Sequence, residues 1–268
     1  MVPPVVDASW VEKNRECLVL ADVRWYVDGR SGQEAYESGH LPGAVFVDLD
    51  KWLSGDPRAG RGRHPLPDAE VFATGMSVLG IADDATVVGY DDQGGVVAAR
   101  LVWMLRATGH SAALLDGGLR CYRGPLEAGG TVVSPAHFVA RPWPQEQLAD
   151  IDDATDPANV VLDARSTERY GGQEDRVDPR AGHIPGAVSL PCGGNLDQNG
   201  RFLPAERLRD RFESAGVLAG AQVVSYCGSG VTACHNLLAL ELCGLVTGRL
   251  YPGSWSEYSS HPDRPVAT

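Results

Sequence analysis

The sequence has no excess of basic residues, no long apolar run and no signal-peptide pattern. Its 35 acidic residues outnumber its 23 basic ones, giving a net charge of −12 at pH 7. Such an acidic chain gains nothing from phosphate backbones, so we expect neither nucleic acid nor an anionic membrane as a partner. No apolar stretch reaches the roughly 20 residues that cross a bilayer. The N-terminus lacks a basic stretch followed by an apolar one, and we expect a cytoplasmic protein.

Cysteines are few, and none form a Cys-x-x-Cys pair. The six are scattered along the chain, so neither a disulfide framework nor a zinc site is indicated. We therefore expect no metal and no cofactor. Hydrophobic residues make up 43% of the 268 residues, which is enough for a core in one large domain or two small ones.

Internal repeats decide between one domain and two. Four segments recur in the same order at an offset of about 140 residues. The pairs are Val19–Arg24 with Val161–Arg165, Gly39–Val45 with Gly182–Val188, Leu79–Tyr90 with Ala215–Tyr226, and Asp116–Tyr122 with Pro252–Tyr258. Four matches in one order predict a duplicated domain. We expect an N-terminal domain over residues 1–133, a proline-containing linker over 134–153 and a C-terminal domain over 154–268.

Each half alternates short apolar runs with helical patterns. Residues 160–162 and 223–226 are typical of strands buried on both faces, whereas 204–215 and 232–242 have helical spacing. Strands that alternate with helices over short connections indicate parallel sheets. The predicted fold is therefore α/β, with two tandem domains that each hold a parallel sheet flanked by helices on both faces.

Cys227 differs from the other five cysteines, which we expect to be small buried hydrophobic residues. It ends a predicted strand and opens the sequence Cys-Gly-Ser-Gly-Val-Thr directly before a helix. A tight strand-to-helix loop directs backbone N–H groups at one point, and such a cradle favours a thiolate. Gly228 and Gly230 permit the unusual backbone angles that the loop needs. We predict Cys227 as the nucleophile, with Gly228, Gly230, Val231 and Thr232 binding the substrate.

The first half serves as an internal control. Asp91 stands where the second half has Cys227, and a carboxylate cannot attack sulfur, so we expect an inactive N-terminal domain and one active site per chain. A cysteine phosphatase uses the same strand–loop–helix geometry. A phosphatase of this kind needs an arginine six residues after the cysteine to bind phosphate. This chain has Ala233 there, which argues against phosphatase activity.

Together these features resemble the two-domain rhodanese-type sulfurtransferases. The likeness covers nearly the whole chain: a Gly-His-[Leu/Ile]-Pro-Gly-Ala segment in each half, an active loop only in the second, and the ending Tyr251–Tyr258. The loop Cys-Gly-Ser-Gly-Val-Thr-Ala is similar to the active-site loop of the 3-mercaptopyruvate sulfurtransferase branch of this family. Thiosulfate-preferring members carry a basic loop of the Cys-Arg-Lys-Gly-Val-Thr type. His40 and His183 recur in both halves, and we assign them structural roles.

Charge agrees with this branch. Thiosulfate is a compact dianion best served by cations inside the loop, and this loop has none. The carboxylate of mercaptopyruvate would be met farther from the sulfur. The resemblance implies that Arg169 and Arg176 bind the substrate, because a guanidinium grips carboxylate and carbonyl oxygens together. Arg180 is the alternative to Arg169.

The resemblance also implies a polar relay at the nucleophile. Ser229 matches a loop serine that assists proton movement at the substrate thiol. Asp50 and His64 fall near residues that family members place beside the site.

The resulting hypothesis is a sulfurtransferase. Sulfur passes from 3-mercaptopyruvate through a Cys227 persulfide to a thiol, thioredoxin or cyanide, and the cysteine itself carries the sulfur. Two alternatives stay open. One is a thiosulfate:cyanide sulfurtransferase, and the other is a non-catalytic binding or sulfur-sensing module with the same fold.

Overall fold

The computed structural model describes residues 2–57, 60–173, 177–245 and 247–268, which form two compact units. The first unit consists of Met1–Gly55, Leu66–Trp143 and Gln198–Phe202, and the second of Asp56–Pro65, Pro144–Asp197 and Leu203–Thr268. Each unit therefore includes a short segment from the other half of the sequence. In the second unit this segment carries His64.

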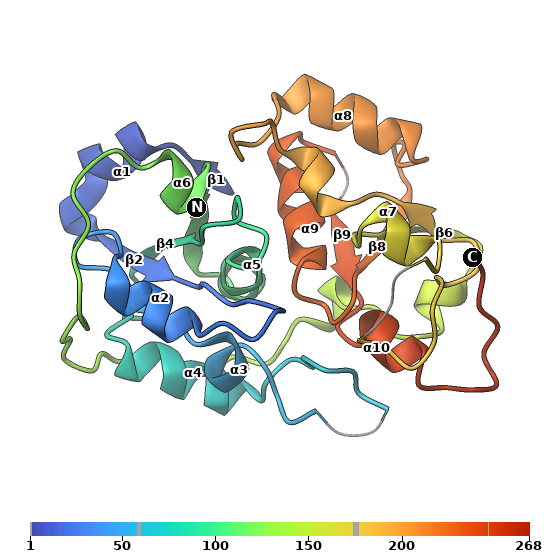
Figure 1. Cartoon of the computed structure of the whole chain (residues 1–268), viewed down its shortest axis with the longest axis horizontal. Coiled ribbons are helices and arrows are strands. Elements are labelled where there is room, and N and C mark those ends of the chain that lie inside the picture. Colours follow the sequence, from blue (N-terminus) through green and yellow to red (C-terminus); the bar gives the residue numbers. More distant parts are fainter. Residues whose placement is uncertain (1, 58–59, 174–176, 246) are drawn as a thin grey trace. The chain divides into compact units, whose positions relative to one another are not determined.

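The first unit is built on a parallel sheet with strand order β1-β5-β4-β2-β3 in its described part. Its strands are β1 (Val5–Val6), β2 (Leu18–Asp22), β3 (Val45–Phe46), β4 (Thr86–Tyr90) and β5 (Ser111–Leu115). Its helices are α1 (Ala8–Asn14), η1 (Arg15–Cys17), α2 (Gly32–Ser38), α3 (Leu49–Trp52), α4 (Ala69–Val78), α5 (Ala99–Ala107) and α6 (Gly118–Cys121). Each of these strands is followed along the chain by a helix (Figure 1).

The second unit repeats this plan with strand order β7-β6-β8-β9, again parallel throughout its described part. Its strands are β6 (Asn159–Asp163), β7 (Val188–Ser189), β8 (Gln222–Tyr226) and β9 (Gly248–Leu250). Its helices are η2 (Gln145–Gln147), η3 (Asp153–Thr155), α7 (Thr167–Tyr170), η4 (Cys192–Asn195), α8 (Ala205–Ser214), α9 (Ala233–Leu242) and α10 (Ser254–Tyr258). The predicted tandem α/β fold is confirmed.

A buried ion pair ends the equivalent strand in both units. Arg24 donates to Asp22 at 2.7 Å and to the carbonyl of Gly39 at 2.8 Å. In the second unit Arg165 makes the same contacts with Asp163, at 2.6 Å, and with Gly182, at 2.7 Å. Each pair joins the strand end to the start of the repeated Gly-His segment. The segment therefore has the same anchor in both units.

The two repeated histidines also have matching contacts. His40 stacks on Tyr36 and pairs through Nδ1 with the Tyr36 carbonyl at 2.9 Å. His183 stacks on Tyr170 and pairs with its carbonyl at the same distance. These contacts fix the loop before β3 in the first unit and the loop before β7 in the second, which is a structural role.

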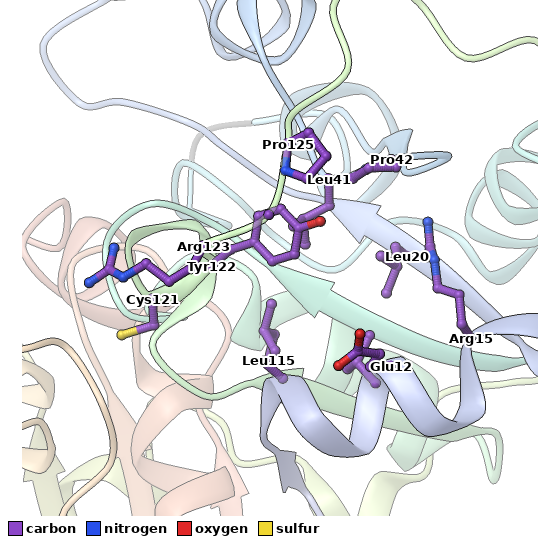
Figure 2. A pocket seen from close by; sticks show the side chains of 13 residues that line it. Glu12, Arg15, Leu20, Leu41, Pro42, Leu115, Cys121, Tyr122, Arg123 and Pro125 are labelled. Atoms are coloured by element: carbon purple, nitrogen blue, oxygen red, sulfur yellow. The ribbon is translucent and has the colours of Figure 1, made fainter.

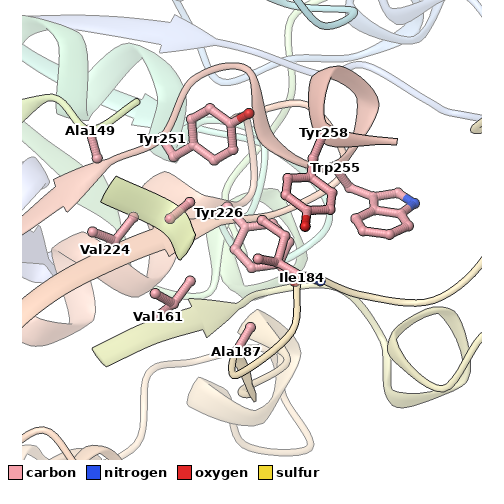
Figure 3. Close-up of a cluster of buried hydrophobic side chains, with 10 residues drawn as sticks. Ala149, Val161, Ile184, Ala187, Val224, Tyr226, Tyr251, Trp255 and Tyr258 are labelled. Carbon is pink, nitrogen blue, oxygen red and sulfur yellow. Dashed lines mark hydrogen bonds between the residues drawn. The ribbon is translucent and has the colours of Figure 1, made fainter. Parts of the chain in front are cut away.

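The core of the second unit anchors α10. Trp255 and Tyr258 are fully buried and their rings stack, with centroids 5.6 Å apart. They pack with a cluster drawn in Figure 3, which comprises Ala149, Ala154, Val161, Ile184, Ala187, Val224, Tyr226 and Tyr251. Burying large aromatic side chains contributes several kcal/mol, about 2–3 for each ring. The backbone of α10 is thereby held in one place. Within the described residues, no helix is long and apolar enough to cross a membrane.

The buried ion pair of Arg24 with Asp22 allows a prediction about stability. We expect Arg24→Ala to lower the free energy of unfolding by about 3–5 kcal/mol, because Asp22 would stay buried without its partner. Arg30 and Asp28 form a pair with the same spacing whose side chains are 67% and 55% exposed. Arg30→Ala should therefore change stability little. Urea unfolding of both variants checks this, and equal losses would contradict the assignment.

Candidate active site

Cys227 lies where β8 leaves the sheet and turns into α9. Its side chain is buried, and the backbone N–H of Gly230 donates to its sulfur at 3.1 Å. An N–H directed at sulfur stabilises a thiolate more than a thiol. Gly230 has a φ of 78°, and a Cβ atom there would lie 2.5 Å from the carbonyl oxygen of Pro252. The loop therefore needs glycine at this position both for its backbone angle and for space.

The N-terminal end of α10 holds the same loop from outside. Trp255 N–H donates to the carbonyl of Cys227 at 3.0 Å, and Ser256 N–H donates to that of Gly228 at 2.9 Å. In return, Cys227 N–H donates to the hydroxyl of Ser254 at 3.1 Å. These bonds satisfy the backbone groups that leave the strand ladder. The N–H of Gly230 is left to face the sulfur.

Ser254 holds this arrangement at a conformational cost. Its φ of 52° lies in the left-handed region, and it is the one non-glycine residue with positive φ among those the structure describes. The equivalent position of the first unit is Gly118, with a φ of 53°. Such strain is kept where the surroundings and a function require it. Here the side chain supplies the acceptor for the N–H of Cys227.

The segment Asp56–Pro65 brings His64 to the loop. Nδ1 of His64 lies 2.7 Å from the hydroxyl oxygen of Ser229, and both side chains are more than nine-tenths buried. Arg63 N–H donates to the hydroxyl of Ser256 at 3.0 Å, which ties the segment to α10. The structure therefore brings together two predicted relay residues that are far apart in sequence.

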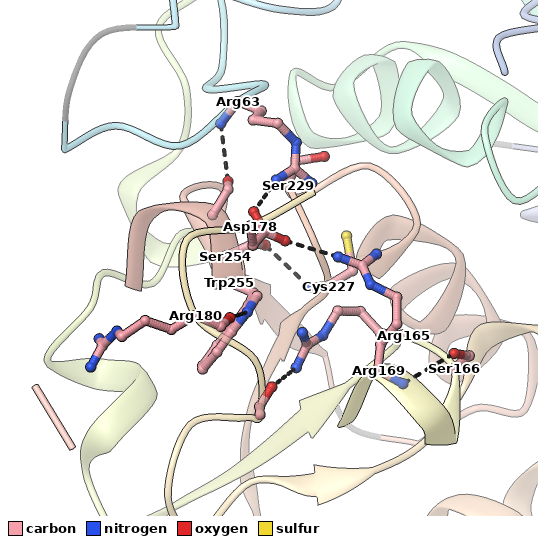
Figure 4. A network of polar contacts seen from close by, with 12 residues as sticks. Arg63, Arg165, Ser166, Arg169, Asp178, Arg180, Cys227, Ser229, Ser254 and Trp255 are labelled. Carbon is pink, nitrogen blue, oxygen red and sulfur yellow. Dashed lines mark hydrogen bonds and ion pairs between the residues drawn. The ribbon is translucent and has the colours of Figure 1, made fainter. Parts of the chain in front are cut away.

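Two arginines flank the residue after the nucleophile. A Cβ atom at residue 228 would lie 3.1 Å from Nη2 of Arg63 and 3.3 Å from Nη1 of Arg169. Asp178 lies between them, and its side chain is buried. Its carboxylate pairs with Nη2 of Arg169 at 2.8 Å and with Nη1 of Arg63 (Figure 4). The positive charge that the loop itself lacks is thus supplied from two other segments.

Comparisons with known proteins identify this arrangement. The family described as Rhodanese-like domain matches residues 7–123 and 144–261. The chain belongs to the rhodanese-like family. A Pseudomonas aeruginosa protein provisionally named 3-mercaptopyruvate sulfurtransferase is 43% identical to it over 94% of this chain and 92% of the relative. The predicted tandem rhodanese-like sulfurtransferase is confirmed.

Two further relatives bear on the sulfur donor. A Mycobacterium tuberculosis protein provisionally named thiosulfate sulfurtransferase SseB is 41% identical over 92% of this chain and 89% of the relative. The solved structure of 3-mercaptopyruvate sulfurtransferase from Leishmania major is 30% identical, with a TM-score of 0.87 over 98% of this chain and 76% of that one. Relatives named for each of the two donors are thus similar to this chain.

In the first rhodanese-like unit, Asp91 fills the loop that corresponds to that of Cys227. Its carboxylate accepts N–H groups from Gln93, Gly95 and Val97 at 2.8 Å each and from Ala98 at 3.0 Å. Burial raises the pKa of Asp91, and these four donors oppose that rise because they stabilise the carboxylate. The N–H groups that would bind an incoming anion are already taken by the chain's own side chain.

The remaining predicted residues of this rhodanese-like chain fall into three groups. Asp50 belongs to the first unit, on α3, where it accepts the indole N–H of Trp25 at 3.0 Å. Arg176 lies outside the described residues. Val231 is buried and Thr232 precedes α9, next to the nucleophile's loop.

Two expectations need correction. The guanidinium of Arg180, the alternative to Arg169, donates to the carbonyls of Tyr258, Ser259, His261 and Arg264. It therefore holds the chain after α10 rather than a substrate. Among the cysteines expected to be buried, Cys234 and Cys243 are, but Cys17 is exposed and Cys121 and Cys192 are intermediate.

Pockets in the first rhodanese-like unit hold none of the sulfur chemistry. One of about 510 Å³ has an apolar lining that includes Leu20, Leu41 and Leu115, with Arg15 and Arg123 at its edge (Figure 2). A second, of about 460 Å³, is more polar and is lined in part by Asp50. Neither contains a side chain from the second unit.

Sequence reasoning missed Ser254, Arg63 and Asp178. The repeat offered a signal for Ser254, because it aligns with Gly118 and is the polar member of that pair. Nothing local distinguishes Arg63 from the neighbouring Arg61, or Asp178 from other acidic residues. Their roles depend on contacts between segments more than 100 residues apart in sequence.

The role of Ser254 can be tested by substitution. Ser254→Ala leaves the buried N–H of Cys227 without its acceptor, and we expect kcat/KM for sulfur transfer to fall about 10- to 100-fold. Ser254→Gly loses the same acceptor but relieves the strained φ, so it should be more stable than Ser254→Ala by about 1 kcal/mol without regaining activity. Steady-state kinetics and urea unfolding measure the two effects. Full activity in Ser254→Gly would contradict this role.

Cys192 is a second thiol near the nucleophile, and its titration can be predicted. The residue as a whole is partly exposed, but its thiol is desolvated, and this desolvation together with the charge of Cys227 raises the pKa of Cys192 to about 12. The thiol is therefore almost wholly protonated at neutral pH. We expect iodoacetamide to modify Cys192 only when the pH is raised toward 12. Mass spectrometry of the alkylated peptide follows the reaction, and rapid labelling of Cys192 at pH 8 would contradict the prediction.

Proposed function

We propose that this chain takes sulfur from 3-mercaptopyruvate and passes it, through a persulfide on Cys227, to a thiol acceptor such as thioredoxin in the cytoplasm. The observation that carries the proposal is the position of the Cys227 sulfur. It accepts the N–H of Gly230, and two guanidinium groups flank the adjoining residue. One such site serves the chain, because Asp91 fills the matching loop. Relatives named for this sulfur donor support the choice.

The first half of the reaction breaks a carbon–sulfur bond. Arg63 and Arg169 bind the carboxylate of the sulfur donor, since a guanidinium matches a carboxylate in shape and charge. The Cys227 thiolate attacks the substrate sulfur, a sulfur–sulfur bond forms, and the bonding pair leaves with carbon as the enolate of pyruvate. The proton of the substrate thiol moves to that enolate carbon. Ser229 and His64 carry this proton in our scheme, and the hydroxyl oxygen of Ser229 lies 2.7 Å from Nδ1 of His64.

The second half returns the cysteine to its starting form. The outer sulfur of the persulfide bears negative charge, and backbone N–H groups of the loop stabilise it. An acceptor thiolate attacks this outer sulfur, the sulfur–sulfur bond breaks, and the electron pair returns to Cys227. No organic cofactor takes part in this scheme, because the cysteine carries the sulfur between the two half-reactions.

Thiosulfate is the second candidate sulfur donor. The absence of a cation from the loop favours mercaptopyruvate, but the guanidinium groups of Arg63 and Arg169 lie beside Gly228, the residue after the nucleophile. A relative named for thiosulfate is also 41% identical. Charge close to the nucleophile favours a compact dianion, so the two sulfur donors must be compared directly.

We expect sulfur transfer to cyanide to have a kcat/KM at least about tenfold higher with mercaptopyruvate than with thiosulfate, a difference of about 1.4 kcal/mol in the transition state. Thiocyanate formation measures both rates. Cys227→Ser should abolish both, and Cys243→Ser, which changes another buried cysteine outside the loop, should leave them within about twofold. A preference for thiosulfate would leave the assignment of Cys227 as the nucleophile intact, but would make thiosulfate the sulfur donor. No transfer from either would favour the binding or sulfur-sensing module.

A further inference from the structure

The acidic side chain between the two arginines is not explained by binding an anion. The side chain of Asp178 is 1% exposed, whereas those of Arg63 and Arg169 are 33% and 27% exposed. Its two carboxylate oxygens are divided between the arginines: Oδ1 is contacted by Arg63 and Oδ2 by Arg169 at 2.8 Å. A carboxylate thus lies behind two cations at the entrance to the nucleophile's loop, where it weakens their attraction for any anionic substrate.

The position of the cluster makes its charge matter. Both guanidinium groups approach the place where a Cβ atom of residue 228 would be, next to Cys227. A sulfur donor whose sulfur reaches Cys227 must therefore bring its negative charge close to these side chains. Electrostatic energy at such short range depends on the net charge of the cluster. Among the residues that the structure describes, two guanidinium groups pair with this one carboxylate, so that these three side chains together carry a single net positive charge.

We propose that Asp178 determines the specificity of the site for its sulfur donor: by cancelling one of the two arginine charges, it matches the site to a singly charged carboxylate rather than to a dianion. This inference rests on the proposed sulfur transfer and adds the residue that sets the substrate's charge. Arg63 becomes a substrate-binding residue, and Asp178 acts through the two arginines without touching the substrate.

A purely structural role for Asp178 predicts something different. If the carboxylate only orients the two arginines, its loss should weaken the use of mercaptopyruvate and thiosulfate alike. If it sets the charge, its loss should favour the dianion over the monoanion. The ratio of kcat/KM values for the two sulfur donors separates these roles, because a general loss of activity cancels in the ratio.

The test uses Asp178→Asn in the full-length chain, which keeps the shape and one oxygen acceptor but removes the charge. We expect the ratio of kcat/KM for thiosulfate to that for mercaptopyruvate to rise about tenfold, mainly through a lower KM for thiosulfate. Asp153→Asn is the matched control, since Asp153 pairs with Arg249 at 2.9 Å within the same unit. It should leave the ratio unchanged.

A charge-restoring double variant makes the test independent of folding defects. Arg63→Gln combined with Asp178→Asn returns the cluster to one positive charge, so the ratio should move back toward that of the wild type. An Asp178→Glu variant keeps the charge and should keep the ratio. An unchanged ratio in Asp178→Asn, or a double variant no closer to the wild type than Asp178→Asn alone, would overturn the inference.

The wild type provides a second measurement and separates this inference from the proposed function. Pyruvate, a monoanion, should inhibit the wild type at lower concentration than sulfate, a dianion, and this order should weaken or reverse in Asp178→Asn. If the wild type transfers sulfur from neither donor, the proposed function fails. If it transfers sulfur but sulfate inhibits as well as pyruvate does, only the role of Asp178 is overturned.

Discussion

Two hydrogen bonds from α10 determine the shape of the nucleophile's loop. Trp255 N–H and Ser256 N–H bind the carbonyls of Cys227 and Gly228, which lose their ladder partners where β8 ends. With both carbonyls held from outside, the N–H of Gly230 can point at the sulfur. These two hydrogen bonds hold the loop in one place because Trp255 and Tyr258 anchor α10 in the core. The chemistry at sulfur therefore depends on the packing of two aromatic rings.

The two rhodanese-like units show what the scaffold fixes and what it leaves open. In the first, Leu119 N–H binds the carbonyl of Asp91, as Trp255 binds that of Cys227. The loop is held in the same way, but the Asp91 carboxylate takes four N–H groups for itself. A carboxylate is long enough to fill the loop, whereas a thiol places one sulfur atom at its rim. The residue at the end of the strand thus decides whether the N–H groups of the loop bind a carboxylate of the chain or face a sulfur atom.

Features encoded within short segments could be predicted from the sequence. The repeats give the tandem fold, and the Cys-Gly-Ser-Gly loop gives the nucleophile's setting, because glycine spacing and strand–helix order are local properties. The meeting of His64 with Ser229 was expected only from the family resemblance, and the structure supplies its cause: Asp56–Pro65 belongs to the second unit. Arg180 was misjudged because its four carbonyl partners lie about 80 residues further along the chain.

The distribution of charge also bears on which substrate the site attracts. A chain with a net charge of −12 repels anions at long range, so attraction must come from cations at the site itself. Salt screens surface charges over about 8 Å at physiological ionic strength, whereas guanidinium groups beside Gly228 act at much shorter range. At that range each added or cancelled charge changes which anion is preferred. In our proposal, the carboxylate of Asp178 behind the two arginines sets the preferred sulfur donor from outside the loop, so the loop itself needs no basic residue.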